Sequence, residues 1–155
     1  MAMQVALAGS WRYAAIEGKT GVDKQHTILL VEDEPLIRMD IAAELRDRGF
    51  EVVEAARAME AVDLLAARSI PIELLLTDVQ MPGEMDGLDL ARWTGEHRPE
   101  IVVSVMSASR EAVARALTLC PPSLVFLKPV ASQPMAKAFE AALGQAAPDK
   151  GADVA

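Results

Sequence analysis

Aromatic residues and cysteine are scarce in this sequence. Aromatic side chains make up 4% of the 155 residues, whereas hydrophobic residues of all kinds make up 52%, so the core must be mainly aliphatic. The single cysteine, Cys120, excludes an internal disulfide and a cysteine-based zinc site. No apolar run approaches the roughly 18 residues of a membrane-spanning helix, and the N-terminal apolar run is too short for a secretory signal. These absences predict a cytoplasmic protein.

Basic residues are also outnumbered. The chain has 15 Lys and Arg against 23 Asp and Glu, a formal net charge of −8. Binding to nucleic acid requires clustered basic side chains that neutralise phosphates, and binding to an anionic membrane surface requires the same. The charge therefore argues against direct nucleic-acid or membrane partners, and it is compatible with a cation bound at an acidic site.

Between residues 26 and 145, short apolar runs alternate with segments of helical periodicity. Strands are predicted over residues 28–31, 50–55, 72–77, 101–106 and 124–127. Helices are predicted from Pro35 to a stop at Gly49, and over 59–68, 88–97, 110–119 and 135–143, the last with Ser132 as N-cap. In a chain of one domain's length, this alternation predicts an α/β fold, a doubly wound five-stranded parallel sheet with five helices.

Two flanking segments stand outside this alternation. Residues 1–25 form a leader that glycines divide into short pieces, and we expect it to be flexible because chain ends are poorly ordered unless they dock. Docking of the leader on a helix face or in a dimer contact is the alternative. Residues 146–155 form a polar tail that we expect to be disordered, which leaves residues 26–145 as the folded domain.

Polar side chains follow the predicted strands, and the clearest case is LLLTDVQMPGEMDG at 74–87. An apolar run there ends at Asp78, and Pro82, Gly83 and Gly87 are expected to break any regular element after it. Ligands of open parallel sheets bind beyond the carboxyl ends of the strands. The residues at the other strand ends are Glu32, Asp33 and Glu34, then Ser107, then Lys128 and Pro129. The fold would bring all of them to one edge of the sheet.

Each of these residue types has a chemical use. Carboxylates that crowd together repel one another unless a cation lies among them, and Mg²⁺ prefers such oxygen ligands. Asp78 is then a candidate nucleophile toward phosphorus, as in aspartyl-phosphate chemistry. Lys128 supplies a positive charge for phosphoryl oxygens, and Ser107 supplies a hydroxyl donor.

The motifs VEDE at 31–34, LLTDVQMPGEMDG at 75–87, Ser107-Ala108 and Lys128-Pro129 together resemble the receiver domain of two-component response regulators. The resemblance covers about residues 26–145 and is to the stand-alone, single-domain type. It implies a flavodoxin-like, CheY-like fold with strand order 2-1-3-4-5.

The resemblance also implies roles for single residues. Asp78 would accept a phosphoryl group from a sensor histidine kinase or a histidine phosphotransfer protein. Glu32, Asp33, Asp78 and the backbone carbonyl of Gln80 would hold Mg²⁺, which Mn²⁺ could replace. Ser107 and Lys128 would contact the phosphoryl group, and the Lys128-Pro129 bond would be cis. The positions implied to switch the domain or tune the lifetime of its phosphoryl group are Gln80, Ala108, Ser109, Val125, Phe126 and Pro129.

One departure from the family pattern concerns the switch. Val125 stands where the family usually has Tyr or Phe, and Phe126 follows it. The switch is therefore hypothesised to use Phe126, Met106 or repacking of the helix over 110–119. Its output would be the surface of the fourth strand, fourth helix and fifth strand, which would act on a protein target that the sequence does not specify. Homodimer formation is left open.

Three functions are compared. The leading one is a signalling receiver that is no enzyme beyond Mg²⁺-dependent self-phosphorylation and autodephosphorylation. The second is a pseudo-receiver, an interaction module without phosphotransfer, against which the complete set of site residues argues. The third is a metal-dependent phosphohydrolase. Such enzymes usually need a second acid two residues after the nucleophile, where this chain has Gln80.

Overall fold

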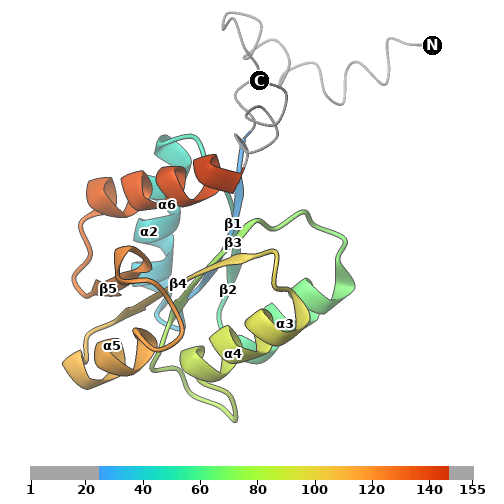
Figure 1. The fold of residues 1–155 in the computed structure, drawn as a ribbon, viewed down its shortest axis with the longest axis vertical. Coiled ribbons are helices and arrows are strands. Elements are labelled where there is room, and N and C mark those ends of the chain that lie inside the picture. Colours follow the sequence, from blue (N-terminus) through green and yellow to red (C-terminus); the bar gives the residue numbers. More distant parts are fainter. Residues whose placement is uncertain (1–24, 147–155) are drawn as a thin grey trace, which may run out of the picture.

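A computed structural model describes residues 25–146, which form a five-stranded parallel sheet with helices on both faces (Figure 1). The strand order is β2-β1-β3-β4-β5. The strands are β1 (Thr27–Val31), β2 (Glu51–Ala55), β3 (Leu74–Asp78), β4 (Val102–Ser107) and β5 (Val125–Leu127). The predicted fold class and strand order are confirmed. The predicted leader up to residue 24 and the predicted tail from residue 147 lie outside the described residues.

The helices cover the sheet in two layers. They are α2 (Pro35–Asp47), α3 (Ala58–Ala67), α4 (Gly87–His97), α5 (Arg110–Ala116) and α6 (Ser132–Ala146), with a short 3-10 turn η1 (Pro122–Leu124). In Figure 1, α2 and α6 lie together on one side of the sheet, and α3 and α4 lie together on the other. Over residues 25–146, no helix has the length and apolar character that crossing a membrane requires.

The central strands are buried on both faces, which explains their continuous apolar sequences. All residues of β1 and β3 are buried, and the parallel register pairs Leu29 with Leu75. Alternate residues of each strand point to opposite faces, so one apolar layer packs under α2 and α6 and the other under α3, α4 and α5.

Several predicted boundaries are wrong by a few residues. The last helix begins at Ser132 rather than after it, because Pro134 lies in the first turn, where its missing N–H costs no hydrogen bond. The helix predicted over 110–119 ends at Ala116, and residues 117–119 form a tighter turn in which Leu119 N–H bonds the Ala116 carbonyl at 2.9 Å. The third strand begins at Leu74, since Ile72 N–H bonds the carbonyl of Ile70 in a turn.

Candidate functional site

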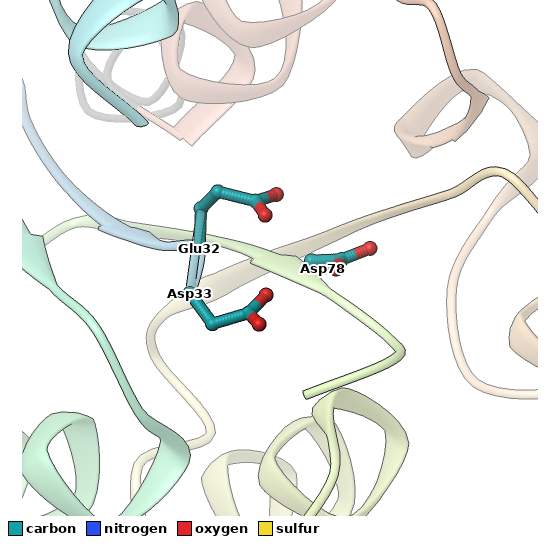
Figure 2. A group of neighbouring side chains, drawn as sticks. All are labelled: Glu32, Asp33 and Asp78. Carbon is teal, nitrogen blue, oxygen red and sulfur yellow. The ribbon is translucent and has the colours of Figure 1, made fainter. Parts of the chain in front are cut away.

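Three acidic side chains meet at the carboxyl edge of the sheet. Glu32 and Asp33 follow β1, and Asp78 is the last residue of β3 rather than the first residue after it. Each offers a carboxylate oxygen, and these oxygens lie within 4.8 Å of one another. Figure 2 shows the three side chains gathered around one space. The parallel order brings together residues that are far apart in the sequence, as predicted.

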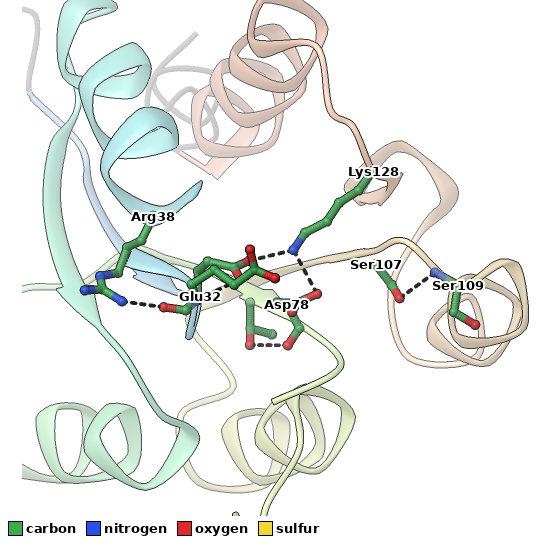
Figure 3. Close-up of polar contacts among 8 residues, drawn as sticks. Glu32, Arg38, Asp78, Ser107, Ser109 and Lys128 are labelled. Carbon is green, nitrogen blue, oxygen red and sulfur yellow. Dashed lines mark hydrogen bonds and ion pairs between the residues drawn. The ribbon is translucent and has the colours of Figure 1, made fainter. Parts of the chain in front are cut away.

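Lys128 lies against two of these acids. Its Nζ donates to Glu32 Oε2 at 2.7 Å and lies 3.3 Å from Asp78 Oδ1 (Figure 3). The side chain of Glu32 is 1% exposed and that of Asp78 is 8% exposed, so the ion pairs are protected from solvent. One ammonium group thus pairs with two acids of a cluster of three, which leaves the cluster with an excess of negative charge.

Burial and this crowding shift the protonation of the site. Burial raises the pKa of Glu32 and of Asp78 above their ordinary values, and the neighbouring Lys128 only partly opposes the rise. Burial alone would lower the pKa of Lys128, but its hydrogen bond to Glu32 and the charge of Asp78 outweigh it, so the pKa is raised. These two carboxylates are thus destabilised as anions, and a cation bound among them would offset this.

Ser107 lies at the end of β4 and is fully buried. Its Oγ accepts a hydrogen bond from the backbone N–H of Ser109 at 3.0 Å, and its carbonyl accepts one from Lys128 N–H at 2.8 Å. Ser109 in turn caps α5, because its Oγ accepts from Ala112 N–H at 3.2 Å. The hydroxyl predicted at the site is therefore hydrogen-bonded to the loop that begins α5 (Figure 3).

The other predicted switch positions lie on β5 and in the loops after β3, β4 and β5. Val125 packs in the layer under α5. Phe126 points to the opposite face, where its ring meets Phe139 edge to face at 6.1 Å. The Lys128-Pro129 bond is cis, as the resemblance implied. Gln80 and Ala108 are exposed in the loops after β3 and β4.

Gly87 has a role that the sequence did not reveal. It was expected to break regular structure, but it is the first residue of α4, and Asp86 is the N-cap in a capping box with Asp89. A Cβ at Gly87 would lie 1.8 Å from the carbonyl oxygen of Asp78. Only glycine lets α4 start this close to the end of β3. The need for glycine here arises from the contact between the start of α4 and the end of β3, and no local sequence pattern indicates that contact.

Arg38 was also missed. It lies one turn into α2, and its Nη1 donates to the carbonyl of Glu32 at 2.7 Å (Figure 3). An arginine in an amphipathic helix ordinarily indicates a solvated face, so nothing in the pattern marked this one.

Comparison with known proteins decides the family. The family model for the response regulator receiver domain matches residues 28–140. The chain belongs to the receiver domain family. Domains of this family act in two-component signal transduction, and their partners belong to two classes of protein, sensor kinases and phosphotransfer proteins.

Individual relatives agree with this assignment. Sensor kinase CckA of Brucella abortus is 36% identical over 103 residues, which cover 66% of this chain and 11% of CckA. Transcriptional regulatory protein PdtaR of Mycobacterium tuberculosis is 43% identical over 91 residues, 57% of this chain and 43% of PdtaR. The chain thus spans less than half the length of either relative.

A solved structure has the same fold. The response regulator receiver protein from Sinorhizobium medicae is 25% identical with a TM-score of 0.69, and the match covers 78% of this chain and 96% of that one. The match extends over nearly the whole of that receiver protein, so its fold accounts for most of the chain described here.

Proposed function

We propose that this receiver domain is phosphorylated on Asp78 by a phosphohistidine donor, a sensor histidine kinase or a histidine phosphotransfer protein. The observation that carries the proposal is the meeting of Glu32, Asp33, Asp78 and Lys128 at one edge of the sheet. A structural ion pair needs one acid for each base, whereas this site holds three acids around one lysine. Such an excess of buried charge is typical of a functional site.

The transfer itself is a displacement at phosphorus. A carboxylate oxygen of Asp78 attacks, the P–N bond of the phosphohistidine breaks, and the histidine nitrogen leaves with the electron pair of that bond. Lys128 lies 3.3 Å from Asp78 Oδ1, close enough for its ammonium group to contact an oxygen of the incoming phosphoryl group. Positioning and charge neutralisation account for most of catalysis in this kind of reaction.

The donor set fits a hard divalent cation. Glu32, Asp33 and Asp78 offer oxygen ligands within 4.8 Å of one another, and the backbone carbonyl of Gln80 is the fourth proposed ligand. Mg²⁺ accepts a few carboxylates and keeps several waters, and Mn²⁺ would accept the same set. Bound there, the ion would neutralise phosphoryl oxygens during transfer. The carboxylates, destabilised by burial and mutual repulsion, favour its binding.

We propose that the switch runs from Ser107 through Ser109 to α5. Phe126 packs against Phe139 on the far face of the sheet, which does not favour it as the moving ring, and Val125 has no ring. A phosphoryl group on Asp78 would accept a hydrogen bond from the Ser107 hydroxyl, and rotation of that side chain toward it would break the bond in which Ser107 Oγ now accepts the N–H of Ser109. Release of Ser109 would weaken the cap of α5, which has only seven residues. Repacking of the surface of β4, α5 and β5 would then signal to a protein target or support a homodimer.

The deciding experiment is the intact mass of the protein after incubation with acetyl phosphate and Mg²⁺. The expected result is one phosphoryl adduct, absent without Mg²⁺ and absent in Asp78→Asn. Asp63→Asn is the matched control, because Asp63 is an exposed acid of α3 away from the site. It should form the adduct as the wild type does.

Other results would favour the other functions. No adduct, together with no beryllofluoride complex at Asp78, would indicate a pseudo-receiver that binds partners without phosphotransfer. Steady consumption of acetyl phosphate at a catalytic rate, without an adduct, would indicate a phosphohydrolase. A receiver should show only the slow turnover of its own autodephosphorylation.

A further inference from the structure

The backbone of Glu32 leaves the sheet at the site. Glu32 N–H still donates to the carbonyl of Ala55 at 3.1 Å, which extends the pairing of β1 with β2 by one residue. The chain then bends through Asp33 and Glu34 into α2. From this point on, the chain that carries the two acids is no longer held by the ladder, so it needs another support.

Arg38 supplies that support. Its Nη1 donates to the carbonyl of Glu32 at 2.7 Å, and its Nε lies 3.4 Å from Glu54 Oε1. The Arg38 side chain is 19% exposed, more buried than an arginine on a solvated helix face. The guanidinium thus joins the bend after β1 to the neighbouring strand β2, which contains Glu54. A planar fork with several donors can bind two such partners at once, which a lysine ammonium does less well.

The remaining groups of Glu32 are held as well. Its Oε1 accepts from Glu34 N–H at 3.3 Å and its Oε2 accepts from Lys128 at 2.7 Å. Arg38 is therefore one of a set of contacts that fix the backbone and the carboxylate of Glu32 together. It touches no carboxylate of the site itself.

We propose that Arg38 is a positioning residue of the phosphorylation site, which holds the bend at residues 32–34 so that Glu32 and Asp33 face Asp78. The inference rests on the proposed function, because the acids are positioned for a divalent cation. Arg38 acts through the backbone of Glu32, and Glu54 keeps the guanidinium in place.

The sign of the effect separates positioning from simple charge. A cation near a dication site repels the ion, so if Arg38 acted only through its charge, removing it would tighten Mg²⁺ binding. If Arg38 acts by positioning, removing it weakens Mg²⁺ binding. Residues that orient metal ligands from outside the ligand set are typically worth 10- to 100-fold in metal affinity.

The experiment measures Mg²⁺ affinity by calorimetry on the full chain. We expect Arg38→Met to raise the Mg²⁺ Kd about tenfold. Arg38→Lys, which keeps the charge but not the fork, should raise it by a smaller factor and keeps the test open if Arg38→Met does not fold. Arg46→Met is the matched control. Arg46 also pairs with Glu54, at 3.1 Å, and donates to the carbonyl of Val52, and its removal should leave the Kd within about twofold.

A second readout needs no metal. Hydrogen exchange at the Glu34 amide, which bonds Glu32 Oε1, should be faster in Arg38→Met than in wild type or Arg46→Met. Three results would overturn this inference and leave the proposed function standing. They are unchanged Mg²⁺ affinity and Glu34 exchange in Arg38→Met, tighter Mg²⁺ binding in Arg38→Met, and a loss of Mg²⁺ affinity in Arg46→Met equal to that in Arg38→Met. A wild-type protein that binds no Mg²⁺ would overturn the proposed function and this inference with it.

Discussion

The two faces of the sheet are packed with different side chains. Under α2 and α6, Phe139 is fully buried and its ring meets Phe50 at 6.4 Å and Phe126 at 6.1 Å, both edge to face. The layer under α5 and the adjoining part of α4 has only aliphatic and small buried residues. They are Val79, Leu88, Ala91, Val105, Ala112, Ala116 and Cys120. The cluster under α2 and α6 thus buries large aromatic area, and the cluster under α5 buries none.

This difference indicates which face can move. Buried aromatic rings contribute large areas and specific ring contacts, so α6 is held firmly. The helix α5 has seven residues, fewer than the roughly 12 to 15 that an isolated helix needs for marginal stability. Its stability must come from tertiary contacts and its cap, and Ser109, which forms that cap, bonds Ser107. The proposed switch thus lies under α5, where the ring contacts that hold α6 are lacking.

The largest expected effect tests the aromatic face. Phe139→Ala should destabilise the protein by about 3–5 kcal/mol, the usual loss for a buried phenylalanine. Val105→Ala, at a fully buried position under α5, should cost about 2 kcal/mol, since it removes two methyl-sized groups. Urea unfolding of both variants measures the comparison. Equal losses would mean that the two faces are held equally.

The second prediction concerns the pH dependence of stability, which tests whether water reaches the buried Cys120 thiol in the cluster under α5. Burial raises the pKa of the Cys120 thiol from 9.0 to about 11. Between these values the folded state keeps a proton that the unfolded state loses, so stability falls as pH rises through this window. The loss should reach about 2–3 kcal/mol above pH 11.

Cys120→Ala provides the control for this pH dependence. The small cavity left by the substitution should lower the free energy of unfolding by the same amount at every pH. The variant should also lack the part of the decrease at high pH that comes from ionisation of Cys120. Urea unfolding at pH 7, 9 and 10.5 measures the difference between the two proteins. Parallel curves would show that water reaches the thiol and that the face is not dry.

The smallest effect tests the cap of α5. Ser109→Ala should destabilise the protein by about 1 kcal/mol, as loss of an N-cap side chain usually does. Faster hydrogen exchange should be confined to residues 112–116. Thr118→Ala is the control. Thr118 follows the C-terminal end of α5, and its exposed hydroxyl donates to the carbonyl of Arg115. Its removal should change stability by less than about 0.5 kcal/mol. Faster exchange in α6 as well would contradict the separation of the two faces.

Much of this fold could be predicted from the sequence. Apolar runs such as ILLV at 28–31 and LLL at 74–76 are buried on both faces of a parallel sheet, and such strands are apolar along their whole length. The polar residues after these runs then meet at one edge, as the contact between Lys128 and Asp78 shows. Helix ends were less predictable. Gly87 was expected to break regular structure and the last helix was predicted to begin after Pro134, yet Gly87 and Pro134 each lie in the first turn of a helix.

The sequence by itself determined the element order and the acidic edge, because hydrophobic periodicity and the residues at strand ends are local patterns. Only the tertiary structure decided what holds that edge. The bond from Arg38 to the Glu32 carbonyl, the close approach of Gly87 to Asp78 and the choice of Phe126 for the α6 face depend on segments that meet in space. A side chain in the sequence carries no mark of its neighbours across the sheet, so these contacts arise only when the strands have paired.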